Sequence, residues 1–259
     1  MIPVSNLHIK TGYGDTAAHK VLFLEPQSSA VSRHTIQMFL LLLLLLTSST
    51  TGEWFNRFLR FPSTLSVENY VLASRDMANF QTAFTICAWV KPWHTGNSYG
   101  VWFSYQAAAT DDNEIGISDN PSSWNKIFIV DVGGSTLLEK GSWTHQCLVW
   151  DFASLTVRSY VDGQEAASKA TAAGRTLNTG GTIVLGQDQD TRRGSFDPNQ
   201  AFGGELYQLN MWSRALEAEE IAGMAGDGLC GSLEPEIAED IVLPWQNFLD
   251  ATRLICLLL

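Results

Sequence analysis

From Phe55 onward the chain alternates short apolar runs with turn-forming residues. In residues 84–90 apolar side chains occupy every second position, which is the spacing of a strand with one buried face. Residues 157–161 lead into Asp162-Gly163, a pair that favours a type I′ turn between antiparallel strands. Further strands are predicted at 101–105, 143–150, 182–185 and 206–212. Many short strands with few helical windows predict an all-β fold, a two-sheet antiparallel sandwich or jelly roll.

One short α-helix is predicted after the last of these strands. Ser213 is a suitable N-terminal cap, because its hydroxyl can accept a hydrogen bond from the first turn. Acidic side chains follow in the early turns, where the helix dipole favours negative charge; they are Glu217, Glu219 and Glu220. Apolar side chains at near-helical spacing would form the buried face, namely Leu216, Ile221 and Met224. The sequence Gly226-Asp227-Gly228 is expected to end the helix.

The N-terminal part of the chain contains a leucine-rich apolar run at residues 38–46. This run is too short to span a bilayer but suits the apolar region of a signal peptide. We therefore expect a signal peptide at 38–52, preceded at 1–37 by an extension that is disordered or arises from a mispredicted start. A single folded domain would occupy 53–259. A buried core helix and a signal anchor are the alternative interpretations of the run.

Composition limits the classes of protein and partner. Hydrophobic residues make up 45% of the chain, which excludes general disorder because enough apolar surface is available to form a core. The formal net charge is −11. By charge alone this argues against a nucleic-acid partner, since affinity for phosphate backbones rests on clustered Lys and Arg.

Four cysteines are present, and an even number in a chain with a signal peptide favours two disulfides. Four cysteines allow three connectivities, and their spacing does not choose among them. The absence of a Cys-x-x-Cys pair argues against a zinc ribbon or a thioredoxin-like site.

Carboxylate and amide side chains gather in two segments that follow predicted strands. The first is residues 111–114, and the second is residues 187–190, which continues through a glycine-containing loop to Asp197 and Gln200. These are hard oxygen donors without His or Cys, which is the ligand set that Ca²⁺ prefers. The alternative is that they are solvated turn residues, because Asp and Asn are favoured turn formers.

Several motifs resemble the pentraxin family of secreted, calcium-dependent, lectin-like proteins. The family signature His-x-Cys-x-x-Trp is present at 145–150, and the calcium segment resembles 185–190, Leu-Gly-Gln-Asp-Gln-Asp. Further matching stretches occur in the family's order at Phe61-Pro62, Asp112-Asn113-Glu114, Asp162-Gly163, Asn210-Met211-Trp212 and Leu243-Pro244-Trp245. The similarity covers residues 55–256. It implies a flattened jelly roll of the concanavalin/laminin-G kind, with one helix packed on one face.

The resemblance also implies two Ca²⁺ ions per subunit. The first would be bound by Asp112, Asn113, Asp188, the backbone carbonyl of Gln189, and Asp190. The second would share Asp188 and Asp190 and add Asp197 and Gln200. A phosphate or carboxylate of the ligand would complete both coordination shells, so that an acidic protein can bind anions. Asp188 stands where the family more often has Glu, which is longer by one methylene.

For the cysteines, the resemblance implies two specific pairs. Cys87 and Cys147 correspond to the family's disulfide, which we expect to join the two sheets. Cys230 and Cys256 are similar to a C-terminal pair of the neuronal and long members, and would hold the C-terminal tail.

The implied function is secreted pattern recognition in innate immunity, with phosphocholine-like, phosphoethanolamine or carbohydrate ligands. The implied assembly is a cyclic homo-oligomer, a pentamer, with effector proteins on the helix face. Gly116 and Ser118 replace the apolar residues that lie beside choline in phosphocholine-binding members, so the specific ligand does not follow. Among the tryptophans, Trp93 and Trp124 lie in predicted loops, and Trp124 is the candidate ligand contact.

Other classes of function compete with this interpretation. A laminin-G-like adhesion module would keep calcium and lose the oligomer. A jelly-roll glycoside hydrolase would use two nearby carboxylates, as Asp188 and Asp190 are. The amides and the second acidic segment favour a metal site instead, and we predict no enzymatic activity. His145 and Cys147 could form a nucleophilic pair, but Cys147 is better explained as half of a disulfide.

Overall fold

The computed structural model describes residues 58–73, 77–93, 99–107, 114–120, 125–127, 130–132, 138–171, 176–229, 237–238 and 240–249. The expected signal peptide at 38–52 and the extension at 1–37 lie outside these residues, as do Asp112, Asn113, Trp124, Cys230 and Cys256. Among the described helices, none has the length and apolar character needed to cross a membrane.

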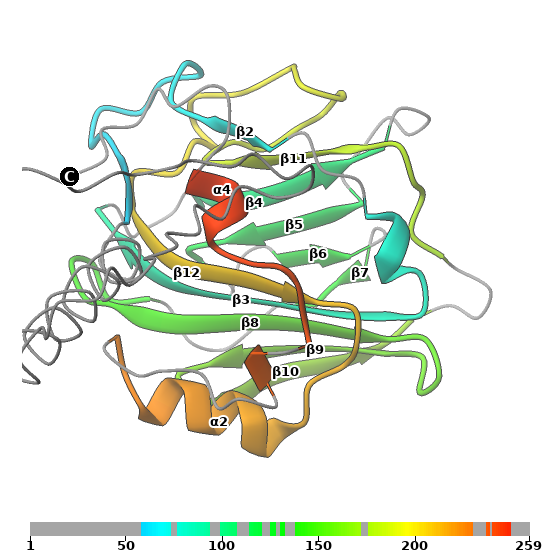
Figure 1. Cartoon of the computed structure of the whole chain (residues 1–259). Helices are drawn as coiled ribbons and strands as arrows, with labels where there is room; N and C mark the ends of the chain where they lie inside the picture. Colours follow the sequence, from blue (N-terminus) through cyan, green and yellow to red (C-terminus); the bar gives the residue numbers. More distant parts are fainter. Residues whose placement is uncertain are drawn as a thin grey trace, which may run out of the picture. The chain divides into compact units, whose positions relative to one another are not determined.

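Two antiparallel sheets form the described part of the chain (Figure 1). The seven-stranded sheet has the order β1 (Leu59–Phe61), β12 (Gly204–Trp212), β3 (Ala83–Pro92), β8 (Thr144–Asp151), β9 (Thr156–Val161) and β10 (Gln164–Ala170), with β13 (Ile241–Leu243) also paired to β12. The six-stranded sheet has the order β2 (Val71–Ala73), β11 (Thr182–Leu185), β4 (Val101–Gln106), β5 (Ile115–Ser118), β6 (Asn125–Ile127) and β7 (Val130–Asp131). The predicted all-β, two-sheet fold is confirmed.

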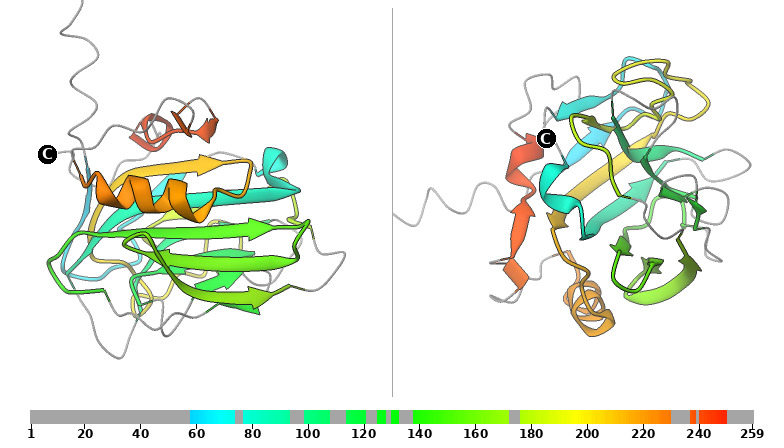
Figure 2. Two further views of the ribbon diagram at one scale, coloured as in Figure 1. Left: turned by 90° about the horizontal axis from the view of Figure 1, so that it is seen from below. Right: turned by 90° about the vertical axis from the view of Figure 1, so that its right-hand side faces the viewer.

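In the described part of the chain, short helical elements accompany the sheets, among them η1 (Ala78–Phe80), α2 (Ala218–Gly226) and α4 (Gln246–Leu249). In both views of Figure 2, α2 lies apart from the six-stranded sheet, on the side of the seven-stranded one. The apolar face of α2 buries Ile221 and Met224 against Val149 and Tyr160 of β8 and β9. The helix is therefore held by the seven-stranded sheet.

The main core lies between the two sheets. Phe84, Ile86 and Val90 of β3 point into it and have no exposed surface, as the alternation predicts. Thr85 and Cys87, on the other face of β3, are also buried, because α2 and the chain before it cover that face. Around β3, the seven-stranded sheet therefore lacks the polar outer face that simple alternation would produce, whereas β10 keeps exposed polar residues.

The start of α2 differs from the prediction. Glu217, not Ser213, is the N-terminal cap, and its N–H donates to Glu220 Oε2 at 2.8 Å. The residues between them cannot be helical, because Thr85 Oγ1 of β3 holds them. It donates to the carbonyl of Arg214 at 2.9 Å and accepts the N–H of Leu216 at 2.9 Å. The helix ends at Gly226, as predicted.

The predicted hairpin between β9 and β10 is confirmed. Asp162 has φ 47° and Gly163 has φ 77°, so both central residues of the turn lie in the left-handed region that a type I′ turn requires. A Cβ at Gly163 would lie 2.9 Å from the Cα of Ala222 in α2, so glycine also permits the helix to pack closely.

The Cys87–Cys147 disulfide is present, but its expected position between the sheets is wrong. Cys87 of β3 and Cys147 of β8 face each other directly in neighbouring strands of the seven-stranded sheet. Directly opposed residues on one face of an antiparallel pair are close enough for this bond. A contact between the sheets is made instead by Gln146, which accepts the indole N–H of Trp102 at 2.7 Å and donates to the carbonyl of Ser118 at 3.2 Å.

Candidate functional site

The second acidic segment, residues 187–190, begins where β11 ends. This is the end of the β4–β11 pair opposite to the one from which the first acidic segment, residues 111–114, continues. β4 and β11 are antiparallel, with Gln106 opposite Thr182 and Phe103 opposite Leu185. The loop that contains 111–113 follows β4, whereas residues 187–190 follow Leu185 at the other end of the pair. Strand order alone would therefore separate the two segments by about 10 Å, the length of three residues of strand.

A sharp turn at Gly186 removes this separation. Gly186 has φ 90°, and a Cβ there would lie 2.2 Å from Cε1 of Phe61 and 3.0 Å from the carbonyl oxygen of Asn69. Glycine is therefore required both by the backbone conformation and by the close approach of Phe61. After this turn residues 187–193, the returning segment, run back along β4 and β11.

Side chains of the sheet fix the returning segment. Ser104 Oγ of β4 donates to the carbonyl of Gln187 at 2.8 Å. The Gln189 amide nitrogen lies within hydrogen-bond distance of the Ser104 carbonyl at 3.3 Å and of the Thr182 carbonyl at 3.1 Å. Gln189 Oε1 in turn accepts the N–H of Arg193 at 3.0 Å. The Gln189 side chain is thus a structural anchor, and metal binding by its backbone carbonyl stays a prediction.

The return carries the predicted ligands of the first ion toward the loop between β4 and β5. Thr182, which contacts Gln189, is paired with Gln106, the last residue of β4 before that loop. Asp188 is buried with 3% exposure, while Asp190 is exposed. Asp112 and Asn113 lie outside the described residues. The adjoining Glu114 is described, and its carboxylate accepts the N–H of Asn178 at 2.6 Å.

The predicted ligands of the second ion lie on the loop that leads back to β12. The Gln200 side chain donates its amide N–H to the Tyr99 hydroxyl at 3.1 Å, so the amide oxygen is the atom left for a cation. Its carbonyl accepts the N–H of Val101 at 2.9 Å. Asp197 Oδ1 accepts two N–H groups of Asn199, at 2.9 and 2.8 Å, in a local turn.

A buried carboxyl group supports the strand segment that holds Gln200. Asp119 follows β5, and its Oδ1 accepts the N–H of Gly100 at 2.7 Å, while its own N–H donates to the Gly100 carbonyl at 2.9 Å. Burial raises the pKa of Asp119 to about 7, and the Gly100 hydrogen bond opposes that rise. Asp119 thus fixes Gly100, between the two residues that contact Gln200.

Of the two candidate ligand positions on β5, Gly116 lies under the returning segment and Ser118 is buried in the protein. Gly116 is opposite Ser104, so it lies on the face that Gln187 and Gln189 cover. Ser118 is buried, and its hydroxyl accepts the N–H of Asn120 at 3.3 Å. Trp93 is half-buried and donates its indole N–H to the Phe61 carbonyl at 3.0 Å, which gives it a structural contact.

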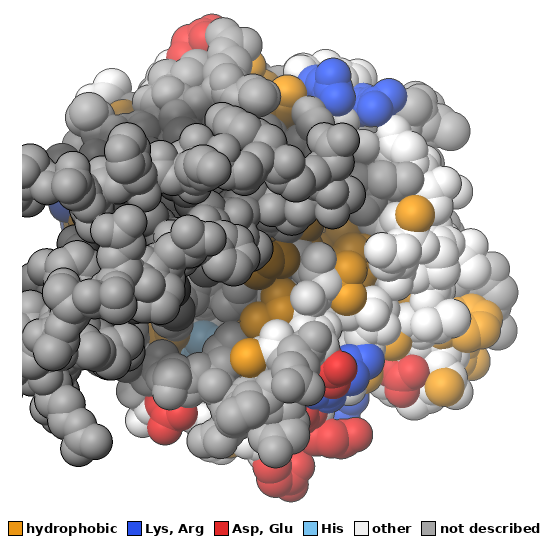
Figure 3. All heavy atoms as spheres, viewed as in Figure 1, with side chains coloured by type: hydrophobic (Ala, Val, Ile, Leu, Met, Phe, Trp, Pro, Cys, Tyr) orange, Lys and Arg blue, Asp and Glu red, His pale blue; other side chains and the backbone are white. Residues whose placement is uncertain are grey.

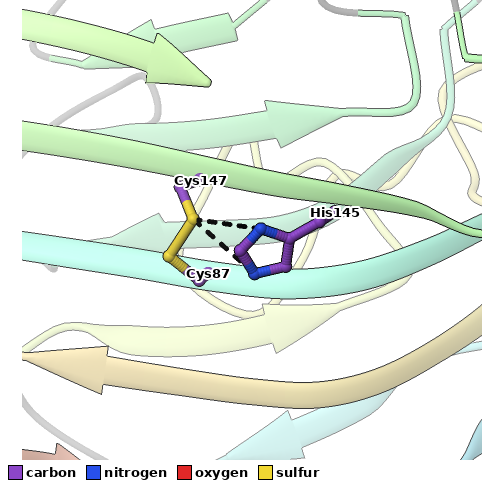
Figure 4. A group of neighbouring side chains, drawn as sticks. All are labelled: Cys87, His145 and Cys147. Carbon is purple, nitrogen blue, oxygen red and sulfur yellow. Dashed lines mark hydrogen bonds between the residues drawn. A yellow bond between two sulfur atoms is a disulfide. The ribbon is translucent and has the colours of Figure 1, made fainter. Parts of the chain in front are cut away.

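The group formed by Cys87, His145 and Cys147 is the cluster of potential metal-binding side chains found among the described residues (Figure 4). Its sulfurs are joined in the disulfide, so neither is a thiolate that could bind a metal or attack a substrate. His145 lies 3.9 Å from Cys147 Sγ, and burial lowers its pKa to about 4. His145 is therefore a neutral, buried side chain, as the structural interpretation of this pair predicts.

The sequence patterns did not identify one feature near the candidate site, a pair of arginines. Arg192 and Arg193 lie between the predicted ligands Asp190 and Asp197, and both are exposed. In Figure 3, Lys or Arg side chains are visible at the upper right, where Figure 1 draws the loop that follows β11. The sequence feature that could have identified this pair is the presence of two adjacent cations inside a carboxylate-rich loop.

Comparison with known proteins assigns the chain to a family. The model of the Pentaxin family matches residues 57–248. Human neuronal pentraxin-2 is 33% identical over 168 residues, which are 64% of this chain and 37% of the relative; the chain thus spans just over a third of that relative's length. C-reactive protein of Mesocricetus auratus is 33% identical over 189 residues, covering 70% of this chain and 77% of the relative.

A solved structure shows the same fold. The heptameric SAP-like pentraxin of Limulus polyphemus superposes with a TM-score of 0.55 at 23% identity, covering 68% of this chain and 84% of that one. The family model extends over most of the chain and includes both strands of the disulfide and the returning segment. The chain therefore belongs to the Pentaxin family.

Proposed function

We propose that this chain is a secreted, calcium-dependent, lectin-like recognition protein that binds phosphate- or carboxylate-bearing ligands. The observation that carries the proposal is the return of residues 187–193 along β4 and β11. The contact of Gln189 with Thr182, the residue opposite Gln106, directs this segment toward the end of β4, and in the sequence the loop with Asp112 and Asn113 follows that end. In this proposal, two segments that are rich in oxygen donors and distant in sequence bind the same ions.

The donor atoms in this site suit calcium. Asp188, Asp190 and Asp197 supply carboxylates, and Gln200 presents its amide oxygen because Tyr99 accepts its N–H. Oxygen donors of this number and charge are the ligands of Ca²⁺, whereas zinc and copper prefer nitrogen and sulfur. When bound, the ions would attract the anionic group of a ligand, which the carboxylates alone would repel.

Assembly and partners belong to the same proposal. The Limulus relative is described as heptameric, and we extend a cyclic homo-oligomer, five-membered in the simplest case, to this chain. The helix α2 and the candidate site lie on different sheets, so α2 remains accessible to effector proteins while a ligand is bound. The proposal includes no catalytic residue.

The function is tested by passing the secreted protein over phosphocholine, phosphoethanolamine and carbohydrate, each immobilised separately, in buffer with calcium. We expect retention on at least one phosphate-bearing matrix and elution when EDTA removes calcium.

Bare matrix and the variant Asp188→Asn/Asp190→Asn are the controls, and neither should show retention that EDTA reverses. Light scattering of the eluted protein should give the mass of several chains. Passage through every matrix, or retention that EDTA does not reverse, contradicts the proposed function.

A further inference from the structure

The two arginines of the returning loop converge on one atom. Arg192 Nε donates to the hydroxyl oxygen of Thr182 at 3.2 Å, and Arg193 Nε donates to the same oxygen at 3.1 Å. Thr182 is fully buried in β11, while both arginines are exposed. The backbone of Arg193 has φ 64° and is fixed by Gln189 Oε1. The two guanidinium groups are thus held by a rigid strand rather than extended freely into solvent.

This convergence places two like charges close together. In the part of the chain that the structure describes, the ion pairs involve Arg60, Lys91 and Arg214, and no carboxylate pairs with Arg192 or Arg193. Each guanidinium uses Nε–H on Thr182 and keeps its Nη donors, which suit the bidentate binding of phosphate or carboxylate. Like charges held together in this way favour a neighbouring anion.

The position of the pair relates it to the proposed calcium site. Arg192 and Arg193 follow Asp190 and precede Asp197 in the same loop. They share Thr182 with Gln189, the residue whose carbonyl is a proposed ligand of the first ion. A ligand whose phosphate binds the ions and whose remaining groups extend toward Thr182 would therefore meet the guanidinium donors.

We propose that Arg192 and Arg193 form an anion subsite that selects ligands with a second negative group beside the calcium-bound phosphate. This inference rests on the proposed function and names the ligand class of the same site. A second carboxylate or phosphate would receive charge-assisted hydrogen bonds, whereas a quaternary ammonium at that place would be repelled. The subsite thus favours acidic phosphate esters over zwitterionic ones.

Three phosphate monoesters that differ in their second group test the subsite: 3-phosphoglycerate with a carboxylate, glycerol 3-phosphate with hydroxyls, and phosphocholine with a cation. Each is titrated calorimetrically into the calcium-saturated protein at low ionic strength, where charge interactions between exposed groups are least screened. We expect 3-phosphoglycerate to bind about tenfold more tightly than phosphocholine, with glycerol 3-phosphate between them.

In the variant Arg192→Gln/Arg193→Gln the three affinities should become equal within about twofold. The control Lys140→Gln/Lys169→Gln removes the same charge from two exposed positions, before β8 and on β10, and should keep the native ranking. The variant Arg192→Lys/Arg193→Lys keeps the charge and should keep a reduced preference, so the test also holds if the glutamine variant does not fold.

Calcium titrated alone separates the two claims. A native chain that binds no calcium contradicts the proposed function. A native chain that binds calcium but ranks the three esters equally overturns the arginine subsite alone. The subsite is also overturned if the glutamine variant binds calcium more tightly with an unchanged ranking, because the arginines would then only neutralise nearby carboxylates.

Discussion

Replacing both cysteines in the variant Cys87→Ala/Cys147→Ala is expected to lower the free energy of unfolding by about 4 kcal/mol. The disulfide closes a loop with a sequence separation of 60 residues, and breaking it returns conformational freedom to the unfolded chain. Cys87 and Cys147 are also buried beneath α2, beside Trp212 and Ile221, so the two truncations remove packing as well.

Denaturant unfolding of the native protein and the variant, both in EDTA, measures this loss. Dithiothreitol provides the matched control: it should lower the midpoint of the native protein by more than that of the variant, in which only Cys230 and Cys256 remain to be reduced. If the free energies of unfolding of the native protein and the variant differ by less than about 1 kcal/mol, the disulfide adds little to the pairing of β3 with β8.

Two buried titratable groups are expected to give the calcium-free protein opposing pH dependences. The pKa of Asp119 is about 7 in the fold, against its ordinary 3.8, because burial disfavours its charged form. The pKa of His145 is about 4 in the fold, against its ordinary 6.5, for the same reason. One shift favours the protonated group and the other favours the deprotonated group.

The two signs follow from proton binding by the folded and unfolded chains. Between about pH 4 and 7 the folded chain keeps the Asp119 proton that the unfolded chain has released, so stability falls as pH rises, by about 4 kcal/mol. Between about pH 4 and 6.5 the unfolded chain binds a proton at His145 that the folded chain lacks, so stability rises with pH, by about 3 kcal/mol. In the native protein the two slopes largely cancel.

Single substitutions at Asp119 and His145 should separate the two contributions to the change of stability with pH. Asp119→Asn keeps an acceptor for the Gly100 N–H, and its stability should rise by about 3 kcal/mol from pH 4 to 7 through His145 alone. His145→Gln should show the opposite trend, a fall of about 4 kcal/mol through Asp119. Unfolding midpoints across this pH range, measured in EDTA, check both. Parallel pH profiles for the two variants would contradict the assignment.

Much of the fold follows from local sequence, because strand alternation and turn chemistry act over a few residues. The strand at 182–185 and the type I′ turn at Asp162-Gly163 are found where they were predicted. The first residue of α2 could not be predicted in this way. Ser213 has the better capping side chain, but Thr85, distant in sequence, holds residues 214–216 out of the helix.

For the disulfide, the sequence motif predicts which cysteines pair but not the sheet in which they lie. The family motif identifies Cys87 and Cys147 as partners, but their common sheet depends on β3 pairing with β8, which no local signal in either strand encodes. A pairing with a strand of the other sheet would have satisfied the same alternation of residues.

For the candidate site, the residue types are evident in the sequence, but the course of the chain after β11 is not. Carboxylates after 182–185 suggest a metal site, yet antiparallel pairing of β4 and β11 would leave them at the far end. The turn at Gly186 against Phe61, and the Ser104 and Gln189 hydrogen bonds, return the segment along the sheet. These contacts join residues more than 80 positions apart, beyond the range of any local pattern.

The central claim is that the returning segment binds calcium, and calorimetric titration of calcium into the chelator-treated protein tests it most directly. The native chain should give saturable heat of binding with about two ions per chain. Asp188→Asn/Asp190→Asn should abolish that heat while leaving the free energy of unfolding in EDTA within about 1 kcal/mol of the native value. Equal heats in the native chain and the variant, or no heat in the native chain, would contradict the calcium site.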